Sequence, residues 1–322
     1  MKIIFMGSPD EVIYPLEAIS KSPRHQLIAV VSQPSRPAGR GGKELDPPVA
    51  QWAKQNNILC LQPPSAKAND FLEELRSLSP DVIVTAAYGQ ILSDEFLKIP
   101  RRATINIHPS KLPEYRGATP VPQALLNGDH STALTILFTV KKLDAGNIIL
   151  QKDFAIQPKE TSGDLTRRLF LASSSMIIDA INLLEDPLFV GEPQNDQSAT
   201  FCKKIAKESG EIDWNLPAES IFNRYRAHEP WPGTWSFLAG KRISITDMSI
   251  EDSSIQAQSK APLPGSIIFD KAGRKLLVST SHGSLAILQL KPAGGKVMDA
   301  ISFWNGVKDK TSARFGPESA TS

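Results

Sequence analysis

Three polar side chains follow apolar runs that have the composition of buried strands: Asn106, His108 and Asp144. Asn106 and His108 are two positions apart at the end of an expected strand over 103–107, so both side chains point to one face of that strand. Asp144 comes shortly after an expected strand over 134–140. If these two strands are neighbours, their carboxyl ends meet, and the amide, the imidazole and the carboxylate share one crevice.

Such a crevice has the groups that acyl transfer to an amine requires. An amide donates a hydrogen bond to a developing oxyanion, and an imidazole moves a proton near neutral pH. A carboxylate beside the imidazole orients it and favours its charged form. No serine or cysteine lies in a GxSxG motif, so the sequence does not predict a covalent intermediate. A single histidine at a strand end also commonly has a purely structural role, and the spacing alone leaves that alternative open.

The composition is that of a globular chain with two domains. The 322 residues are 41% hydrophobic and 22% charged, which provides enough apolar material for real cores. No run of 18 apolar residues occurs, and the apolar start MKIIFMG is too short for a signal peptide, so neither a membrane span nor secretion is expected. Cys60 and Cys202 lie far apart in no metal-binding motif, which indicates a reducing compartment. We expect the cytoplasm, although the sequence does not distinguish it from an organelle matrix.

Strand-like and helix-like segments alternate along residues 1–185. The expected strands are 2–6, 27–32, 82–87, 103–107 and 134–140, and the expected helices are 9–20, 49–55, 66–78, 120–126 and 161–184. This alternation is typical of an α/β domain with a Rossmann-like, doubly wound parallel sheet, whose ligands bind beyond the carboxyl ends of the strands. The first strand-to-helix turn has one glycine rather than GxGxxG, so dinucleotide binding is not predicted.

The texture of the sequence changes after residue 185. Residues 186–204 contain Pro187, Gly191 and Pro193 and have few apolar side chains, which predicts a linker. Short strand-like runs recur over 205–310 and indicate a smaller, barrel-like β domain, and a polar tail is expected over 311–322. The net charge of +2 is uneven, because residues 203–322 carry 16 basic and 12 acidic side chains and residues 1–202 carry 20 and 22. This excess permits a polyanionic partner but does not demand one.

Motifs around the three polar residues resemble those of a known family. Residues 108–120, HPSKLPEYRGATP, resemble the signature HxSLLPxYRGAxP of formyltransferases that use 10-formyltetrahydrofolate. Residues 143–146, LDAG, resemble the LDTG motif of that family, and residues 86–89, AAYG, resemble the motif that precedes its folate pocket. The resemblance implies a Rossmann-type catalytic domain followed by an OB-like domain.

The resemblance also implies a role for each chemical group. Asn106 would orient the formyl carbonyl and stabilise the oxyanion, His108 would assist that stabilisation and shuttle a proton, and Asp144 would orient His108 and keep it basic. The formyl donor would be 10-formyltetrahydrofolate, and no metal is expected. The expected folate contacts, partly through backbone groups, are Tyr88, Gly89, Gln90, Leu92, Ser110, Lys111, Leu112 and Pro113.

Further motifs resemble landmarks of methionyl-tRNA formyltransferases. Residues 33–41, QPSRPAGRG, resemble the loop QPDRPAGRG, and residues 212–214, 230–233 and 290–296 resemble landmarks of the second domain. The implied acceptor is the α-amine of initiator methionyl-tRNA. Because basic side chains grip phosphates and base edges, the tRNA contacts are expected at Arg36, Arg40, Lys43, Lys203, Lys204 and Lys207, with Arg224 and Arg226 as further candidates. A monomer is expected.

Three positions depart from the family pattern. Lys111 replaces a leucine on the expected folate wall, Asn147 replaces an aspartate beside Asp144, and Glu11 replaces a phenylalanine after the first turn. We expect Asp144 to keep its role despite Asn147, and Glu11 to change only local packing. Lys111 would contact the glutamate tail of the folate or point to solvent.

Other functions remain as alternatives. A formyltransferase for a nucleotide-linked amino sugar is disfavoured by the RPAGRG loop, and a purine-synthesis formyltransferase is disfavoured by the second domain. A catalytically silent RNA-binding protein is disfavoured by the intact Asn106, His108 and Asp144. A 10-formyltetrahydrofolate hydrolase, with water as the nucleophile, stays open.

Overall fold

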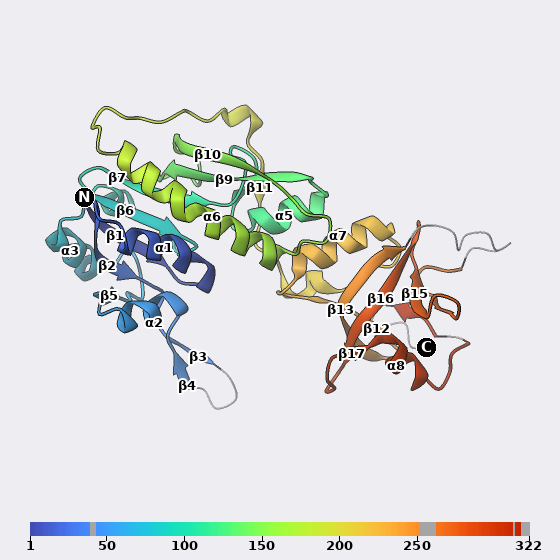
Figure 1. Cartoon of the computed structure of the whole chain (residues 1–322). Coiled ribbons are helices and arrows are strands. Elements are labelled where there is room, and N and C mark those ends of the chain that lie inside the picture. Colours follow the sequence, from blue (N-terminus) through green and yellow to red (C-terminus); the bar gives the residue numbers. More distant parts are fainter. Residues whose placement is uncertain (39–42, 252–261, 312, 317–322) are drawn as a thin grey trace. The chain divides into compact units, whose positions relative to one another are not determined.

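The chain folds into two compact units (Figure 1). The computed structural model describes residues 1–38, 43–251, 262–311 and 313–316. The first unit consists of residues 1–120, 130–156 and 164–203, and the second consists of residues 121–129, 157–163 and the chain from 204 onward. Within the described ranges, none of the helices has the length and apolar character that a membrane span requires.

The first unit is built on a seven-stranded sheet in the order β10-β9-β7-β6-β1-β2-β5. Its strands are β1 (Lys2–Gly7), β2 (Gln26–Val31), β5 (Cys60–Leu61), β6 (Val82–Ala86), β7 (Ala103–His108), β9 (Ser131–Phe138) and β10 (Ile148–Ala155). β5, β2, β1, β6 and β7 pair in parallel. Both faces of β1 are covered, because Ile3 and Phe5 on one face and Ile4 and Met6 on the other have no exposed surface. The predicted Rossmann-like α/β class is confirmed.

Helices and short segments connect these strands. They are η1 (Asp10–Val12), α1 (Ile13–Ser20), α2 (Pro48–Gln55), α3 (Asn69–Leu78), α4 (Asp94–Leu97), α6 (Ser162–Leu183) and η2 (Asp196–Ser198). The apolar side chains of α3 recur at three- and four-residue spacing, so Phe71, Leu72 and Leu75 lie on one face and join the core that contains Ile4 and Met6. The stretch that resembles the loop QPDRPAGRG contains β3 (Arg36–Ala38), which pairs with β4 (Lys43–Leu45) in a short hairpin.

β9 and β10 form an antiparallel edge of this sheet. His108 pairs with Thr135 and Ile105 pairs with Phe138, so β9 runs opposite to β7. The expectation that the carboxyl ends of these two strands meet is therefore wrong. Asp144, in the loop between β9 and β10, nevertheless lies beside the end of β7, because its carboxylate contacts Asn106 and His108.

The second unit is an antiparallel sheet that closes on itself. Its elements are α5 (Pro120–Asn127), η3 (Lys207–Gly210), α7 (Ala218–His228), β12 (Thr234–Leu238), β13 (Lys241–Glu251), β14 (Ile267–Asp270), β15 (Lys275–Ser279), β16 (Ser284–Pro292), β17 (Met298–Asp299), α8 (Ala300–Asn305) and β18 (Phe315–Gly316). The strand order is β14-β15-β16-β13-β12-β18, with β17 on β16. The two ends meet through hydrogen bonds from Ile267 N–H to Ala313 O at 3.2 Å and from Phe315 N–H to Gly265 O at 2.9 Å. This closure gives the barrel that the strand pattern predicted.

Two stretches expected to be irregular contribute to the folded units. The expected linker groups with the first unit up to Lys203, where β11 (Phe201–Cys202) pairs in parallel with β8 (Arg116–Gly117). The stretch expected to be a polar tail contains Phe315, which is 1% exposed and stacks on Trp214 with ring centroids 5.6 Å apart. A single aromatic residue in a polar stretch thus fills the core of the second unit, which composition alone does not reveal.

Candidate active site

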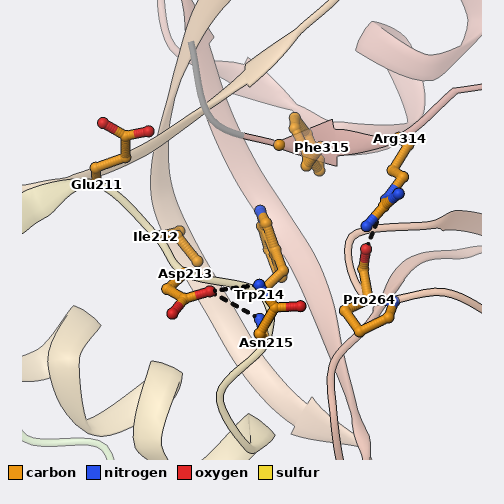
Figure 2. Close-up of a pocket in the computed structure, with 9 residues that line it drawn as sticks. Glu211, Ile212, Asp213, Trp214, Asn215, Pro264, Arg314 and Phe315 are labelled. Carbon is orange, nitrogen blue, oxygen red and sulfur yellow. Dashed lines mark hydrogen bonds between the residues drawn. The ribbon is translucent and has the colours of Figure 1, made fainter. Parts of the chain in front are cut away.

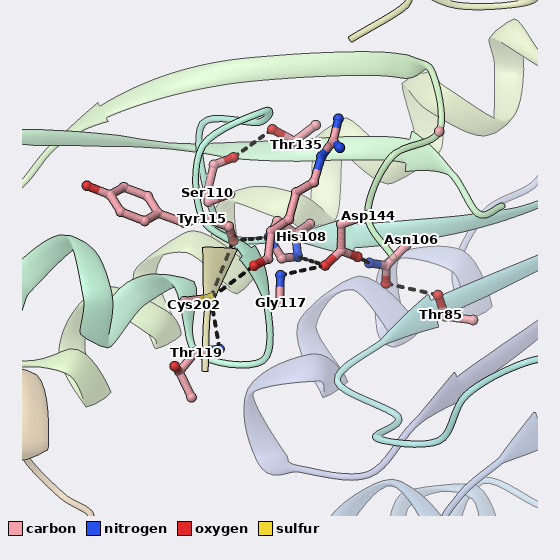
Figure 3. A network of polar contacts seen from close by, with 12 residues as sticks. Thr85, Asn106, His108, Ser110, Tyr115, Gly117, Thr119, Thr135, Asp144 and Cys202 are labelled. Carbon is pink, nitrogen blue, oxygen red and sulfur yellow. Dashed lines mark hydrogen bonds and ion pairs between the residues drawn. The ribbon is translucent and has the colours of Figure 1, made fainter. Parts of the chain in front are cut away.

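Asn106 is held on β7 by its neighbour on β6 (Figure 3). Thr85 Oγ1 donates hydrogen bonds to Asn106 Oδ1 at 2.9 Å and to Ile105 O at 3.1 Å. Because the amide oxygen already accepts a hydrogen bond from Thr85, the amide nitrogen points the other way, where it lies 3.5 Å from Asp144 Oδ1. The half-buried amide therefore presents its N–H groups on the same side as Asp144.

His108 lies between two oxygen acceptors and is 4% exposed. Its Nε2 lies 3.0 Å from Tyr115 O, and its Nδ1 lies 3.7 Å from Asp144 Oδ2 (Figure 3). A carbonyl oxygen only accepts hydrogen bonds, so Nε2 carries a proton in this arrangement. Nδ1 faces a carboxylate oxygen at slightly more than hydrogen-bond distance, and a proton there would also be favourably placed.

Asp144 is fixed by a backbone donor from another loop. Its Oδ2 accepts a hydrogen bond of 2.8 Å from Gly117 N–H, and its side chain is 10% exposed. Its backbone has a φ of +49°, a conformation that costs energy for any residue other than glycine. The structure thus brings the predicted residues Asn106, His108 and Asp144 together around one carboxylate.

Gly117 has to be glycine for two independent reasons. Its φ is +126°, and a Cβ atom at this position would lie 2.3 Å from Cys202 O on the paired strand β11. The buried thiol of Cys202 lies 3.5 Å from Tyr115 O, and burial raises the pKa of this thiol. The Cys202 contacts therefore hold the loop whose Tyr115 carbonyl meets His108.

The loop after β7 is fixed through its backbone carbonyls. Ser110 O accepts from Thr135 Oγ1 at 2.6 Å, and Leu112 O accepts from Gln151 Nε2 at 3.0 Å. Ser110 Oγ in turn donates to Glu114 O at 2.8 Å. This part of the expected folate wall therefore has a defined shape that is set by β9 and β10.

Lys111 and Pro113 complete this wall. The Lys111 ammonium lies 3.0 Å from Asp153 Oδ2, and both side chains are largely exposed. Lys111, which departs from the family pattern, thus has an ion-pair partner within the chain. Pro113 is half-buried after the buried Leu112.

In the other segment expected to contact the folate, residues 88–92, the Tyr88 side chain is buried and the main chain anchors the loop. The Tyr88 ring packs in the hydrophobic core with Leu92 at its edge, and burial raises the pKa of Tyr88 to about 12. The Tyr88 hydroxyl has no hydrogen-bond partner among the described residues. Tyr88 O accepts from Gln33 Nε2 at 2.8 Å, so the loop is anchored from its main chain.

Gly89 and Gln90 turn this loop away from the core. Gly89 has a φ of +84°, which favours glycine, and it is exposed. Gln90 Oε1 accepts from Ala66 N–H at 2.6 Å, so its side chain braces the loop against the start of the α3 region.

The residues expected to contact tRNA fall in two separate stretches of the chain, 36–43 and 203–207. Arg36 is exposed at the start of the β3–β4 hairpin, and Lys203, Lys204 and Lys207 are exposed. Lys43 pairs with Ala38 through the backbone of this hairpin. Arg40 lies outside the described residues.

The two arginines of α7 are less available than expected. Arg226 is 6% exposed, and its Nη2 donates to Asn223 Oδ1 at 2.6 Å. Burial lowers the pKa of Arg226, which is consistent with a structural cation rather than a surface one. The expectation that Arg226 presents its charge to tRNA is therefore wrong, because α7 turns this side chain inward. Arg224 is half-buried and donates to Ser209 O at 3.1 Å.

A cavity of about 310 Å³ occurs in the second unit (Figure 2). Its lining residues are Glu211, Ile212, Asp213, Trp214, Asn215, Pro264, Arg314, Phe315 and Gly316. Several of its polar groups are already bonded, since Asp213 Oδ1 accepts from Asn215 at 2.9 and 3.0 Å and Arg314 Nε donates to Pro264 O at 2.7 Å. None of the predicted site residues lines this cavity. Among the described residues, no group of three or more His, Cys, Asp or Glu side chains is placed to hold a metal ion.

Sequence reasoning missed three residues that shape the site. Thr85 orients Asn106, and Gln194 and Arg116 support the Asp144 loop from the expected linker and the signature loop. Arg116 belongs to the YRG motif and is fully buried, which a motif match does not reveal. Gln194 offered no signal of its own, because it lies in a stretch whose composition predicts a linker.

Comparison with known proteins identifies the family of the chain. Residues 1–181 match the formyl transferase family, and residues 204–308 match the formyl transferase C-terminal domain. The chain is 37% identical over 316 residues to the methionyl-tRNA formyltransferase of Roseiflexus castenholzii, covering 98% of this chain and 99% of that one. It is 35% identical over 307 residues to the methionyl-tRNA formyltransferase of Moorella thermoacetica, covering 95% and 96% of the two chains. The chain belongs to the methionyl-tRNA formyltransferase family.

Solved structures share the fold of this formyltransferase at low sequence identity. HypX from Aquifex aeolicus in complex with tetrahydrofolic acid is 16% identical, with a TM-score of 0.64 over 94% of this chain and 46% of that one. The sugar 3N-formyl transferase WlaRD is 19% identical, with a TM-score of 0.62 over 89% of this chain and 96% of that one. At these identities the likeness concerns the fold of the formyltransferase and not its acceptor.

Proposed function

We propose that this enzyme transfers the formyl group of 10-formyltetrahydrofolate to the α-amine of initiator methionyl-tRNA. The observation that carries the proposal is the arrangement of Asn106 and His108 around the Asp144 carboxylate, in a chain related over its whole length to methionyl-tRNA formyltransferases. These groups suit a direct attack by an amine, because they include an N–H donor for an oxyanion and a proton carrier.

The proposed reaction is one addition followed by one elimination. The α-amine attacks the formyl carbon, a new C–N bond forms, and the carbonyl electron pair moves to the oxygen in a tetrahedral intermediate. Asn106 Nδ2 and protonated His108 stabilise this oxyanion, and Asp144 balances the charge on His108. Collapse breaks the bond between the formyl carbon and N10 as protonated His108 gives its proton to N10, and the neutral His108 then takes the proton lost by the amine.

The formyl donor is proposed to lie along residues 88–92 and 110–113 of the first unit, beside the loop that carries Asp144. The ion pair between Lys141 and Asp94, at 2.8 Å, joins the loop before Asp144 to the start of α4, where the loop after β6 ends. These loops expose the apolar side chains of Ile91, 76% exposed, and Leu143, 60% exposed. Such exposed apolar groups beside a polar crevice suit the flat ring system of a folate.

The acceptor tRNA is proposed to meet the β3–β4 hairpin and the basic residues of the stretch 203–207. Exposed Arg36 and the exposed Lys203, Lys204 and Lys207 support this proposal, and Arg40 and Lys43 are assigned to the same role. We also propose that the enzyme acts as a cytoplasmic monomer.

A formylation assay with an acceptor panel tests the proposal. Purified full-length enzyme receives 10-formyltetrahydrofolate and, in separate reactions, initiator methionyl-tRNA, uncharged initiator tRNA, a UDP-linked amino sugar or no acceptor. Formyl transfer to methionyl-tRNA alone is expected. Transfer to the sugar alone would overturn the acceptor assignment, and release of formate at the same rate without an acceptor would indicate a hydrolase.

A further inference from the structure

Gln194 joins the segment before the second unit to the Asp144 loop. Its Nε2 donates to Asp144 O at 2.8 Å and to Gly146 O at 2.7 Å. Its Oε1 accepts from Arg116 Nε at 3.2 Å and from Arg116 Nη2 at 2.8 Å. All four hydrogen bonds of this amide are made within the first unit.

The orientation of the Gln194 amide is dictated by its partners. A guanidinium group only donates hydrogen bonds, so the amide oxygen must face Arg116. The amide nitrogen is then directed at the two carbonyl groups of the loop. Arg116 itself has no exposed surface, and its charge is balanced by Asp196 at 2.8 Å, which also pairs with Lys142. The acceptor end of Gln194 is therefore held by a buried, neutralised cation, which fixes the direction of its donor end.

The loop that Gln194 holds has an energetically unfavourable backbone conformation. Asp144 has a φ of +49°, and a Cβ atom on Gly146 would lie 1.9 Å from Phe138 O. A non-glycine residue stays in this backbone conformation only when its surroundings fix it. The Gln194 hydrogen bonds to the carbonyls of Asp144 and Gly146 provide such a restraint on both sides of Ala145.

We infer that Gln194 is a positioning residue for formyl transfer, acting through Asp144. It holds the backbone of Asp144 so that the carboxylate stays within reach of Asn106, His108 and the Gly117 N–H group. The inference rests on the proposed role of Asp144. The segment that carries Gln194 continues to Lys204, where the second unit begins. The expected linker is therefore a structural part of the active site.

Two substitutions separate positioning from a plain packing role. Gln194→Glu keeps an oxygen for Arg116 and adds a favourable charge, but it places a second oxygen against the two loop carbonyls. A residue needed only to partner Arg116 would tolerate this change. Gln194→Met keeps the length of the side chain and removes all four hydrogen bonds. Asn147→Ala is the matched control, because Asn147 Nδ2 ties the same loop to the same segment at Val190 O, 2.9 Å away, without touching Asp144.

The experiment measures kcat and KM for formyl transfer, with thermal unfolding as a check of folding. We expect Gln194→Glu and Gln194→Met to lower kcat about 10- to 100-fold, with the KM values of both substrates within about threefold of wild type. The kcat of Asn147→Ala should stay within about twofold of wild type. The kcat of each variant is divided by the wild-type kcat for whichever acceptor supports turnover. A wrong acceptor assignment can therefore be told apart from a wrong role for Gln194.

Three outcomes would overturn the inference. A wild-type kcat for Gln194→Glu would show that only the contact with Arg116 matters. An equal loss in Asn147→Ala would show that any attachment of the segment suffices. Unfolding of both Gln194 variants would assign the residue to folding instead of positioning.

Discussion

Gly117 N–H donates a 2.8 Å hydrogen bond to Asp144 Oδ2 across 27 positions of the chain. This bond links the loop after β7 to the loop after β9. Because β7 and β9 are antiparallel, these two loops leave the sheet at opposite ends of the strand pair. It also occupies the same carboxylate oxygen that faces His108. The two loops therefore form one site only while both Gly117 and Asp144 keep their backbone conformations.

Asp144→Asn tests the need for a negative charge beside His108. The amide can still accept the Gly117 N–H hydrogen bond, so folding should persist, but it cannot balance a charge on the imidazole. We expect kcat to fall about 100- to 1,000-fold while the KM values change little. Steady-state kinetics at several pH values measure this effect. A kcat within threefold of wild type would show that the carboxylate charge is not used.

Gly117→Ala tests the close approach of β8 and β11. The new methyl group would meet Cys202 O at 2.3 Å in a backbone region with φ of +126°, so we expect a loss of about 2–4 kcal/mol in the free energy of unfolding of the first unit. Gly294→Ala is the control, because it has a φ of +74° but nothing within 4 Å of a Cβ atom. Thermal unfolding followed by circular dichroism compares the two. Equal losses would mean that backbone strain rather than the clash limits Gly117.

Asp46→Ala tests the neck of the β3–β4 hairpin, the point at which Ser35 and Asp46 meet. Asp46 binds Lys54 at 2.6 Å and Ser35 at 2.7 Å, and these contacts, the Lys54 bond first, lower the pKa of its carboxyl. Ser35 and Asp46 flank the hairpin, so their hydrogen bond closes its base. We expect the KM for methionyl-tRNA to rise about threefold to tenfold, with the KM for the folate unchanged.

The control for the hairpin neck is an ion pair elsewhere on the first unit. Arg24 and Glu185 form an exposed pair at 2.5 Å, and Glu185→Ala removes a comparable contact. A similar rise in the tRNA KM for both variants would contradict a specific role for the neck.

His228 makes the stability of the second unit depend on pH. Burial, and next the nearby Arg224, lower the pKa of His228 from 6.5 to about 4, and its Nδ1 has no hydrogen-bond partner among the described residues. Between these pH values the unfolded chain binds a proton that the folded chain does not. Stability therefore falls as the pH is lowered through this window, by up to about 3 kcal/mol.

The pH dependence is measured by urea unfolding with tryptophan fluorescence. Trp214, Trp231, Trp235 and Trp304 all lie in the second unit and only Trp52 lies in the first, so the signal reports mainly on the second unit. His228→Gln should flatten the slope between pH 6.5 and 4, whereas substitution of the exposed His282 should not. An unchanged slope in His228→Gln would contradict this account.

Local patterns predicted strands β1, β2, β6, β7 and β9 of the first unit but not β5 or β10. Phe71, Leu72 and Leu75 show helical spacing, and Asn106 and His108 share a strand face by simple alternation. The direction of β9 was not predictable in this way. Strand direction depends on connections and pairing partners. No local pattern in the loop that carries Asp144 shows that this residue contacts the end of β7.

Long-range contacts escaped prediction for the same reason. Gln194 and Phe315 lie in stretches of low hydrophobicity, yet one supports the Asp144 loop and the other fills the barrel core. Arg226 was expected at the surface because a cation count ignores the direction in which a helix turns each side chain. The resemblance to formyltransferases supplied what spacing alone left open, namely which of the isolated polar residues act together.

The most direct test of the account is the single-turnover rate of formyl transfer to initiator methionyl-tRNA by wild type and His108→Ala. Both proteins are mixed with 10-formyltetrahydrofolate, and binding of the tRNA is measured separately. The account predicts that wild type forms formylmethionyl-tRNA, that His108→Ala does so about 1,000-fold more slowly, and that tRNA affinity is retained. A His108→Ala rate within tenfold of wild type would contradict the central role of the imidazole between Tyr115 O and Asp144.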